Sequence, residues 1–355
     1  MIDETRNVCV VPADPAYGAI RYFELMTTPI IWITAGMSLA TCFVFGQPAA
    51  SFGASMGCAP RPASSFIVNV RDRGARGDGQ TDDTSAIQSA IDEVAKKGGT
   101  VLVPNGTYMV NAVGDARLFI ESNVILKLAN DAVLKAIPND SKKYSVLRIS
   151  NASNVAVIGG TIEGERYGHS GDIGEWGMGI WIGEGAEHVT ISGVTAAKMW
   201  GDGFYIQGAN DVKLCYVNAD NNRRQGLSII QVNGLEIKSS IFQNTHGTRP
   251  SAGIDIEPDN DEQHVAAVRI RDSQFLNNAG PGIVVVGKKS VVSNIEITRN
   301  KFFGNLHPLT VKGACGRENA TYDTEQLGGG SFAYVDVTEL VIAKNKCLRP
   351  RGHRQ

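Results

Sequence analysis

Two carboxylates stand two residues apart in the segment GIDIEPDND, Asp255 and Glu257. On a β-strand, such residues point to the same face, with Cα atoms about 7 Å apart. Their carboxyl groups would then lie about 5–9 Å apart, which includes the separations of both retaining and inverting glycosidases. Two close acids also split their pKa values, giving one acid and one base. We therefore take this pair as candidate catalytic residues, against two alternatives: a solvated strand face, or a Ca²⁺-binding turn with Asp259, Asn260 and Asp261.

The pair belongs to a repeat in which a glycine precedes each short apolar strand. These glycines are Gly179, Gly203, Gly226, Gly253 and Gly282, at spacings of 24, 23, 27 and 29 residues. Each repeat continues with a polar turn, a second alternating strand and a third short segment, and none contains a convincing helix. Units of this kind stack as the coils of a solenoid. Left-handed corner conformations are expected at asparagines, namely Asn218, Asn221, Asn244, Asn277 and Asn300.

Alternation with period 2 assigns an inward and an outward side chain to every position. The inward set is uniformly apolar: Ile180, Phe204, Leu227, Ile254 and Ile283, then Ile182, Ile206, Ile229, Ile256 and Val285. The outward side is polar only in the middle coils. We expect one exposed patch there, made of Asp202, Tyr205, Gln207, Gln225, Ser228, Asp255 and Glu257.

Cationic and aromatic residues lie on the turns that lead into this patch: Trp200, Arg223, Arg224, His246 and Arg249. Aromatic faces can stack on sugar rings, arginines can hold a carboxylate, and acids transfer protons. These residues are therefore candidate substrate-binding residues, together with Gln225, Tyr205, Gln207 and Ser228, and Asp202 is a third candidate catalytic carboxylate. Arg223 and Arg224 have an equally plain alternative as turn residues paired with Asp220 or Asp202.

The segment TDDTSAIQSAIDEVAKKGG predicts a helix that caps the solenoid. Asp82 or Asp83 can cap its start, and Gly98 and Gly99 can end it. Its apolar residues recur at helical spacing and form one face. An open coil end would expose the core and unpaired backbone, so a cap is needed at this point.

The segment FIVNVRDRGARGDGQTDDTSAIQSAIDEVAKKGGTVLVPNGTYMV resembles the N-terminal signature of the pectate-lyase-like superfamily. That group includes polygalacturonase-like hydrolases, alginate epimerases and phage tail-spike depolymerases. The resemblance covers residues 66–350 and implies an all-β fold, a right-handed parallel β-helix solenoid with an N-terminal capping α-helix. It also implies a polysaccharide or oligosaccharide substrate, acidic in many relatives, but not one reaction.

The resemblance is imperfect at the positions that carry chemistry. Asp202 in WGDGFYI resembles the Asp-Gly step of polygalacturonases, but Gln225 stands where they have histidine, and their paired Asp-Asp is missing. Asp255 resembles the aspartate of the epimerase catalytic strand, but an Ile-Glu-Pro run around Glu257 replaces the histidine expected after it. An ordinary polygalacturonase mechanism is therefore in doubt.

We expect a carbohydrate-active enzyme that cleaves a polysaccharide, by polygalacturonase-like hydrolysis with the carboxylate pair. The alternatives are a polysaccharide lyase or uronate C5-epimerase, and a non-catalytic polysaccharide-binding β-helix. Zinc spacings, phosphate loops and a Ser-His-Asp order are lacking, so no cofactor is expected, with Ca²⁺ entering only for a lyase. The formal net charge of −2 gives no reason to expect nucleic acid as a partner.

The N-terminal extension, residues 1–65, contains a stretch of uncharged residues at 26–45 that is long enough to span a bilayer. A small-residue, Pro/Ser-rich stretch follows it, as after a signal segment. We therefore predict export, with the protein either released or membrane-anchored; residues 1–25 could precede the true start. The β-helix domain spans 66–350, and 351–355 form a basic tail.

Four cysteines bear on this prediction. Cys58 in SMGC weakly resembles a lipoprotein cleavage site, and Cys215 is predicted to be a small core residue. Cys315 and Cys347 lie in the last coils and could pair in an exported chain.

Overall fold

The computed structural model describes residues 57–58, 64–114, 117–286 and 292–312, followed by the backbone of four short strands within 320–347. The chain divides into two units, 1–54 and 55–355, and every described residue belongs to the second. The predicted signal or anchor segment, Cys315 and the basic tail lie outside the described residues. Within the described part, no helix is both long and apolar enough to cross a membrane.

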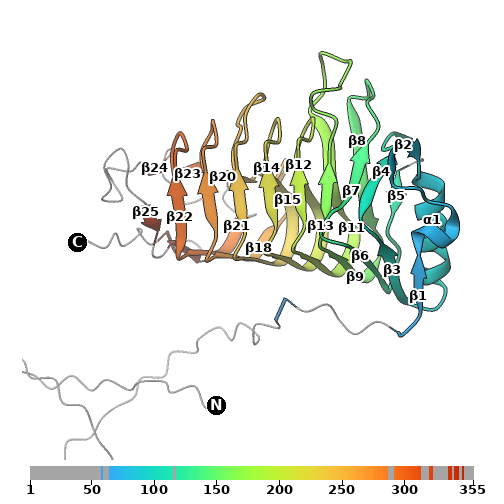
Figure 1. Ribbon diagram of the computed structural model, residues 1–355. Helices are drawn as coiled ribbons and strands as arrows, with labels where there is room; N and C mark the ends of the chain where they lie inside the picture. Colours follow the sequence, from blue (N-terminus) through green and yellow to red (C-terminus); the bar gives the residue numbers. More distant parts are fainter. Residues whose placement is uncertain are drawn as a thin grey trace, which may run out of the picture. The chain divides into compact units, whose positions relative to one another are not determined.

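The described chain winds into a parallel β-helix with two sheets (Figure 1). The first sheet contains β1 (Ile67–Asn69), β3 (Gly99–Val103), β5 (Leu118–Phe119), β6 (Val124–Leu128), β8 (Lys143–Ser150), β9 (Ser153–Ile158), β11 (Trp176–Ser192), β13 (Phe204–Cys215), β15 (Leu227–Lys238), β17 (Ile254–Ile256), β18 (Val265–Arg271), β20 (Ile283–Val286), β21 (Val292–Thr298), β23 (Leu309–Lys312), β24 (Ala320–Tyr322), β26 (Leu340–Ala343) and β27 (Lys346–Cys347). The second sheet contains β2 (Asp78–Asp82), β4 (Gly106–Val110), β7 (Ala132–Ala136), β10 (Thr161–Glu163), β12 (Thr195–Ala197), β14 (Asn218–Asp220), β16 (Ile241–Gln243), β19 (Gln274–Leu276), β22 (Asn300–Phe303) and β25 (Val335–Val337).

The predicted register of the five glycine-led strands is confirmed. Strands β11, β13, β15, β17 and β20 are parallel neighbours in that order, and their first inward residues align as Ile180, Phe204, Leu227, Ile254 and Ile283. Both predicted inward columns are fully buried and belong to one continuous core. Alternation along each strand is thus sufficient to separate the core face from the outer face.

Helix α1 (Thr84–Ala95) lies at the N-terminal end of the solenoid, next to the short 3₁₀ helix η1 (Val70–Arg73) (Figure 1). Its apolar face packs against β1, β3, β5 and β6. Of the two candidate caps, the Asp82 carboxylate accepts the backbone N–H of Thr84 at 3.0 Å. Asp83 instead accepts the backbone N–H groups of Arg76 and Gly77, so it fixes the loop before β2.

The asparagine corners are confirmed in three cases. Asn221, Asn244 and Asn277 adopt the left-handed conformation, with φ of 56°, 56° and 53°. The prediction was wrong for Asn218 and Asn300, which lie in strands β14 and β22. Asn300 is buried, where its amide donates to the Ile270 carbonyl.

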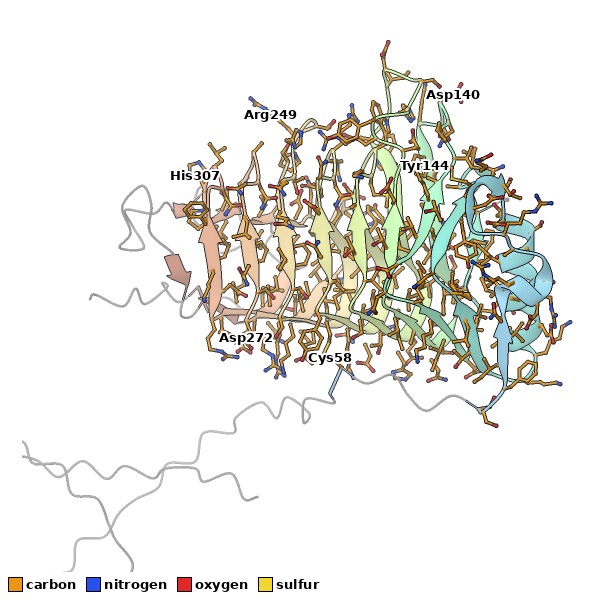
Figure 2. The ribbon with its side chains drawn as sticks, viewed as in Figure 1. Cys58, Asp140, Tyr144, Arg249, Asp272 and His307 are labelled. Carbon is orange, nitrogen blue, oxygen red and sulfur yellow. A yellow bond between two sulfur atoms is a disulfide. The ribbon has the colours of Figure 1, made fainter. Side chains whose placement is uncertain are left out.

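Cys215 is fully buried, as predicted, but it lies outside the inner core and is joined to Cys58 by a disulfide, with Cα atoms 6.0 Å apart. It aligns with Ser192 and Lys238 on the outer face of the first sheet, while its neighbour Leu214 points into the core. Cys58 lies at the edge opposite the turns that carry Arg249 and His307 (Figure 2). A sulfur held in a disulfide cannot also carry a lipid thioether, so the lipoprotein interpretation of Cys58 does not fit.

Candidate active site

The predicted polar column is assembled on β13, β15 and β17. Tyr205, Ser228 and Asp255 are paired across these strands, and Asp202 and Gln225 precede the first two. The exposed patch expected from alternation is wrong, because Asp202 and Gln225 are 0% exposed and Ser228 and Asp255 only 1%. Alternation assigns a side chain to the outer face but cannot show what covers that face. Here the side chains of the turn before β15 fold back over the column.

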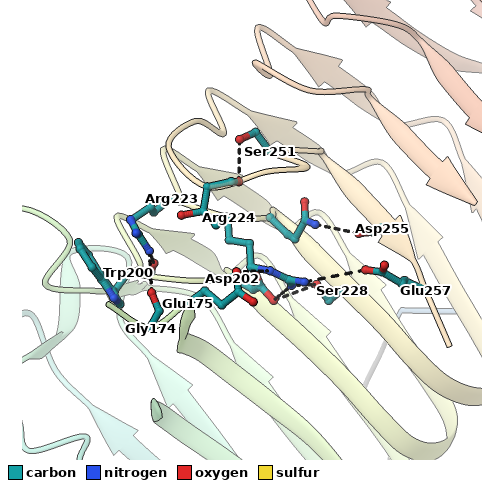
Figure 3. A network of polar contacts seen from close by, with 12 residues as sticks. Gly174, Glu175, Trp200, Asp202, Arg223, Arg224, Ser228, Ser251, Asp255 and Glu257 are labelled. Atoms are coloured by element: carbon teal, nitrogen blue, oxygen red, sulfur yellow. Dashed lines mark hydrogen bonds and ion pairs between the residues drawn. The ribbon is translucent and has the colours of Figure 1, made fainter. Parts of the chain in front are cut away.

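Arg224 is the centre of a carboxylate network (Figure 3). Its Nη1 donates to Asp202 Oδ2 and to Ser228 Oγ, both at 3.2 Å. Its Nε lies 3.5 Å from Glu175 Oε2, and its Nη2 lies 3.9 Å from Glu257 Oε2. Ser228 in turn donates to Asp202 Oδ2 at 2.8 Å. The predicted ion pair with Asp202 is therefore present, and the guanidinium is already engaged before any substrate binds.

Asp255 is held by Gln225, which stands where the resemblance predicts histidine. Gln225 Nε2 donates to Asp255 Oδ2 at 2.8 Å, and Gln225 Oε1 accepts the backbone N–H of Ala252 at 2.8 Å. The other oxygen of Asp255, Oδ1, is buried and has no hydrogen-bond partner among the described residues.

A groove of about 790 Å³ brings the two candidate catalytic carboxylates to one surface. Asp255 and Glu257 both line it, and the Glu257 side chain is 41% exposed. Arg249 also lines it, as predicted for a binding residue. The remaining lining comes from Gly247, Pro250, Ser251, Ala279, Pro281, Val284, Val286, Leu306, His307 and Thr310.

Burial dominates the electrostatics of Asp202 and Asp255. Desolvation raises the pKa of Asp202 to about 6, although Arg224 and Ser228 oppose the shift. Desolvation and the negative charge of Glu257 raise the pKa of Asp255 well above its ordinary value. This raised pKa favours the protonated form of Asp255. For Arg224, burial lowers the pKa, but the surrounding carboxylates outweigh burial and the net shift is upward.

Tyr205 is paired with Ser228 on the neighbouring strand, and its phenol is protonated. Desolvation and the charges of Asp259 and Asp202 raise its pKa well above the ordinary value. The ring belongs to a small apolar cluster on the outer face, with Met178, Trp181 and Ile230. Tyr205 therefore contributes packing and a neutral hydroxyl to the site.

Trp200 does not offer a free ring face to a sugar, contrary to the prediction. The His169 ring stacks on its indole at 3.9 Å between centroids, and the Arg223 guanidinium lies 3.7 Å from the centroid. Two groups so close to one indole cannot share a face without overlapping, so they occupy both faces. Arg223 also donates to the carbonyls of Gly174 and Trp200 (Figure 3). The contact between Arg223 and Trp200 therefore stabilises the turn next to the carboxylate network.

Gln207 and His246 lie apart from the carboxylates. The predicted patch placed Gln207 near Glu257, but the strands shift register after Ile206, so that Gln207 aligns with Gln231. Ile230 is the extra residue of a β-bulge, which spacing counted from glycines does not reveal. His246 is exposed on a turn, where its carbonyl accepts from Arg166, and it is not among the groove-lining residues.

Two residues at the site were missed. Glu175 contacts Arg224, and His307 lines the groove. A signal for His307 exists, because the backbone column that contains Gln225 and Pro281 continues with His307 in the next coil. The strand of that coil is preceded by Pro308 in place of glycine. A repeat recognised by its glycines therefore ends one coil before His307. No cluster of three or more His, Cys, Asp or Glu side chains able to hold a metal ion occurs in the described part of the chain.

Comparisons with known proteins agree with this architecture. A family model described as right-handed β-helix region matches residues 102–263, and one described as rhamnogalacturonase A/epimerase, pectate lyase-like, matches residues 67–126. The structure of an N-terminal fragment of the bacteriophage Phi29 gene product 12 has a TM-score of 0.54 at 19% identity, covering 69% of this chain and 43% of that chain. That likeness shows the fold.

Curated relatives match parts of the chain. The uncharacterized protein YclG of Bacillus subtilis is 29% identical over 63% of this chain and 46% of its own length. The mannuronan C5-epimerase AlgE4 of Azotobacter vinelandii is 38% identical over 38% of this chain and 27% of its own length. Alginate lyase 7 of the same organism is 39% identical over 30% of this chain and 13% of its own length.

The chain spans less than half the length of these relatives. Their matches, the two family models and the parallel coils agree on one assignment. The chain belongs to the pectate-lyase-like superfamily of right-handed parallel β-helix proteins.

Proposed function

We propose that the chain is an enzyme that hydrolyses a polysaccharide with Asp255 as general acid and Glu257 as its carboxylate partner. The observation that carries this proposal is the contrast between the two groups. Asp255 is buried and keeps its proton, whereas Glu257 is 41% exposed, and both line one groove. Glycosidases use two carboxyl groups held in different protonation states in this way.

The hydrogen bonds of Asp255 suggest where its proton sits. Oδ2 accepts a hydrogen bond from Gln225, so this oxygen is better left without a proton. Oδ1 has no partner among the described residues, which leaves it to carry the proton. A sugar in the groove would receive this proton on its glycosidic oxygen as the bond to the leaving group breaks. Glu257 would then act as the base for water or as the nucleophile.

Lyase or C5-epimerase chemistry on a uronate polymer is the second candidate. Its support is the similarity to proteins named mannuronan C5-epimerase and alginate lyase, over about a third of this chain. Arg249 and His307 line the same groove and could hold a uronate carboxylate. The acid–base pair would then move the C5 proton, and either Ca²⁺ or an arginine would neutralise the carboxylate of the sugar.

We further propose that the chain is exported. The Cys58–Cys215 disulfide supports export, because structural disulfides persist in oxidising compartments. The uncharged stretch at 26–45 is consistent with a signal or anchor segment.

One screen separates the reactions. The full chain is incubated with homogalacturonan, alginate and neutral glucans, and three products are scored together. New reducing ends alone indicate hydrolysis, and reducing ends with the ultraviolet absorbance of unsaturated sugars indicate elimination. Altered C5 configuration by NMR without cleavage indicates epimerisation. Binding with no product on any polymer contradicts the catalytic proposal and favours a binding protein.

A further inference from the structure

A second pocket, of about 630 Å³, lies on the outer side of the first sheet, where β13 and β15 shift register. Carboxamides dominate its polar side chains. Its lining consists of Glu184, Gly185, Gln207, Gly208, Ala209, Asn210, Gln231, Val232, Asn233 and His264. None of these residues lines the groove that holds the acid pair.

The four amide side chains form two pairs in neighbouring coils. Gln207 aligns with Gln231, and Asn210 aligns with Asn233. Neighbouring strands lie about 4.8 Å apart, so each pair presents two amides at that spacing. Within the described part of the chain, none of the four side chains makes a hydrogen bond. Each amide offers two N–H donors and one acceptor oxygen, and a hydroxyl group can satisfy either.

The charges at this pocket suit a hydroxyl-bearing ligand better than an anionic one. Glu184 is the only acidic residue in the lining, and its Oε1 pairs with Arg148. No lysine or arginine lines the pocket. A carboxylate would therefore find no fixed positive charge there, in contrast to the groove with Arg249.

One short segment of the chain contributes to the lining of both the groove and the pocket. Glu257 lines the groove at the start of the segment 257–264, and His264 lines the pocket at its end. Along β13, Gln207 follows Tyr205 by two residues, or about 7 Å.

We propose that this pocket is a sugar subsite, which binds one unit of the polymer by its hydroxyl groups through the paired amides. The proposal rests on the proposed function insofar as the ligand is a polysaccharide. It adds that the polymer is recognised by uncharged hydrogen-bonding groups in the pocket, whereas it is recognised by charge at Arg249 in the groove.

The test measures affinity in the Asp255→Asn background, in which the polymer is expected to stay intact. Dissociation constants come from affinity electrophoresis in gels that contain homogalacturonan, alginate or a neutral β-glucan. The double variants Gln207→Ala/Gln231→Ala and Asn210→Ala/Asn233→Ala should each raise Kd about tenfold, the effect of losing two hydrogen bonds. Gln274→Ala, an amide on the second sheet, is the matched control and should leave Kd unchanged.

Salt provides the second readout. The tenfold effect should be the same at low and high ionic strength, while the effect of Arg249→Ala on an acidic polymer should shrink as salt screens its charge. An unchanged Kd in both double variants overturns the proposal. The proposal also fails if the Asp255→Asn protein is not retarded in any of the polymer-containing gels. Full activity of Asp255→Asn would instead contradict the proposed function, and the Kd values would then be compared on a polymer that the background protein does not cleave.

Discussion

The side-chain amide of Gln225 is a fixed hydrogen-bond donor to Asp255. Its Oε1 is occupied by the backbone N–H of Ala252, so its Nε2 must face Asp255 Oδ2, at 2.8 Å. The contact orients the carboxyl group and leaves Oδ1 without a protein partner. Glutamine at this position cannot itself exchange a proton, so the acid–base work is left to the carboxyl groups.

We expect Asp255→Asn and Glu257→Gln each to lower turnover about 10²–10⁴-fold, because each removes a proton-transfer group. Neither should lower the melting temperature. Asn keeps an acceptor for Gln225 and removes a buried acid, and the Glu257 side chain is 41% exposed. Initial rates and thermal unfolding of the same preparations check both statements. Retention of full activity by both variants on a confirmed substrate would show that this pair is not catalytic.

The pKa of Asp202 predicts a specific dependence of stability on pH. Its pKa is raised from 3.8 to about 6 in the folded protein, so the folded state binds the proton more tightly than the unfolded state does. This contribution to stability is complete below pH 3.8 and is lost as pH rises to about 6. Melting temperatures of wild type and Asp202→Asn across this range should differ progressively, with the wild type losing relative stability as pH rises. A constant difference would contradict the raised pKa.

Removal of Arg224 should destabilise the fold rather than only weaken binding. Arg224→Ala leaves Asp202 buried without its cation, which costs about 3–5 kcal/mol in the free energy of unfolding. Asp202→Asn in the same chain should restore most of that loss, because the stranded charge is then gone. Denaturant unfolding of the two single variants and the double variant measures the coupling. If the effects of the two substitutions simply add, the ion pair does not contribute to stability.

The disulfide should stabilise the β-helix against unfolding. Cys215→Ser should lower the free energy of unfolding by about 2–5 kcal/mol, since the bond closes a long loop of the unfolded chain. Reductant should destabilise the wild type by a similar amount and leave the variant unaffected. Peptide mapping without reduction should recover Cys58 joined to Cys215. Recovery of both as free thiols from the exported protein would contradict the assignment.

The amino-acid sequence was enough to predict the solenoid, the order of its glycine-led strands and the two faces of each of these strands. The glycine spacing and the period of 2 are local properties, and they placed Ile254 inward and Asp255 outward without knowledge of the rest of the chain. They also brought Asp202, Ser228 and Asp255 into adjoining coils, which the structure confirms.

What covers those residues, and which of their atoms make contact, depends on the three-dimensional packing of the coils. Burial of Asp255 depends on a turn from another coil, and the raised pKa that makes it an acid follows from that burial. The bulge at Ile230 moved Gln207 out of the predicted patch and into a different pocket. The pairing of Cys58 with Cys215 spans 157 residues. Such contacts depend on turn lengths and on the stacking of distant coils, so a pattern that repeats along one strand carries no information about them.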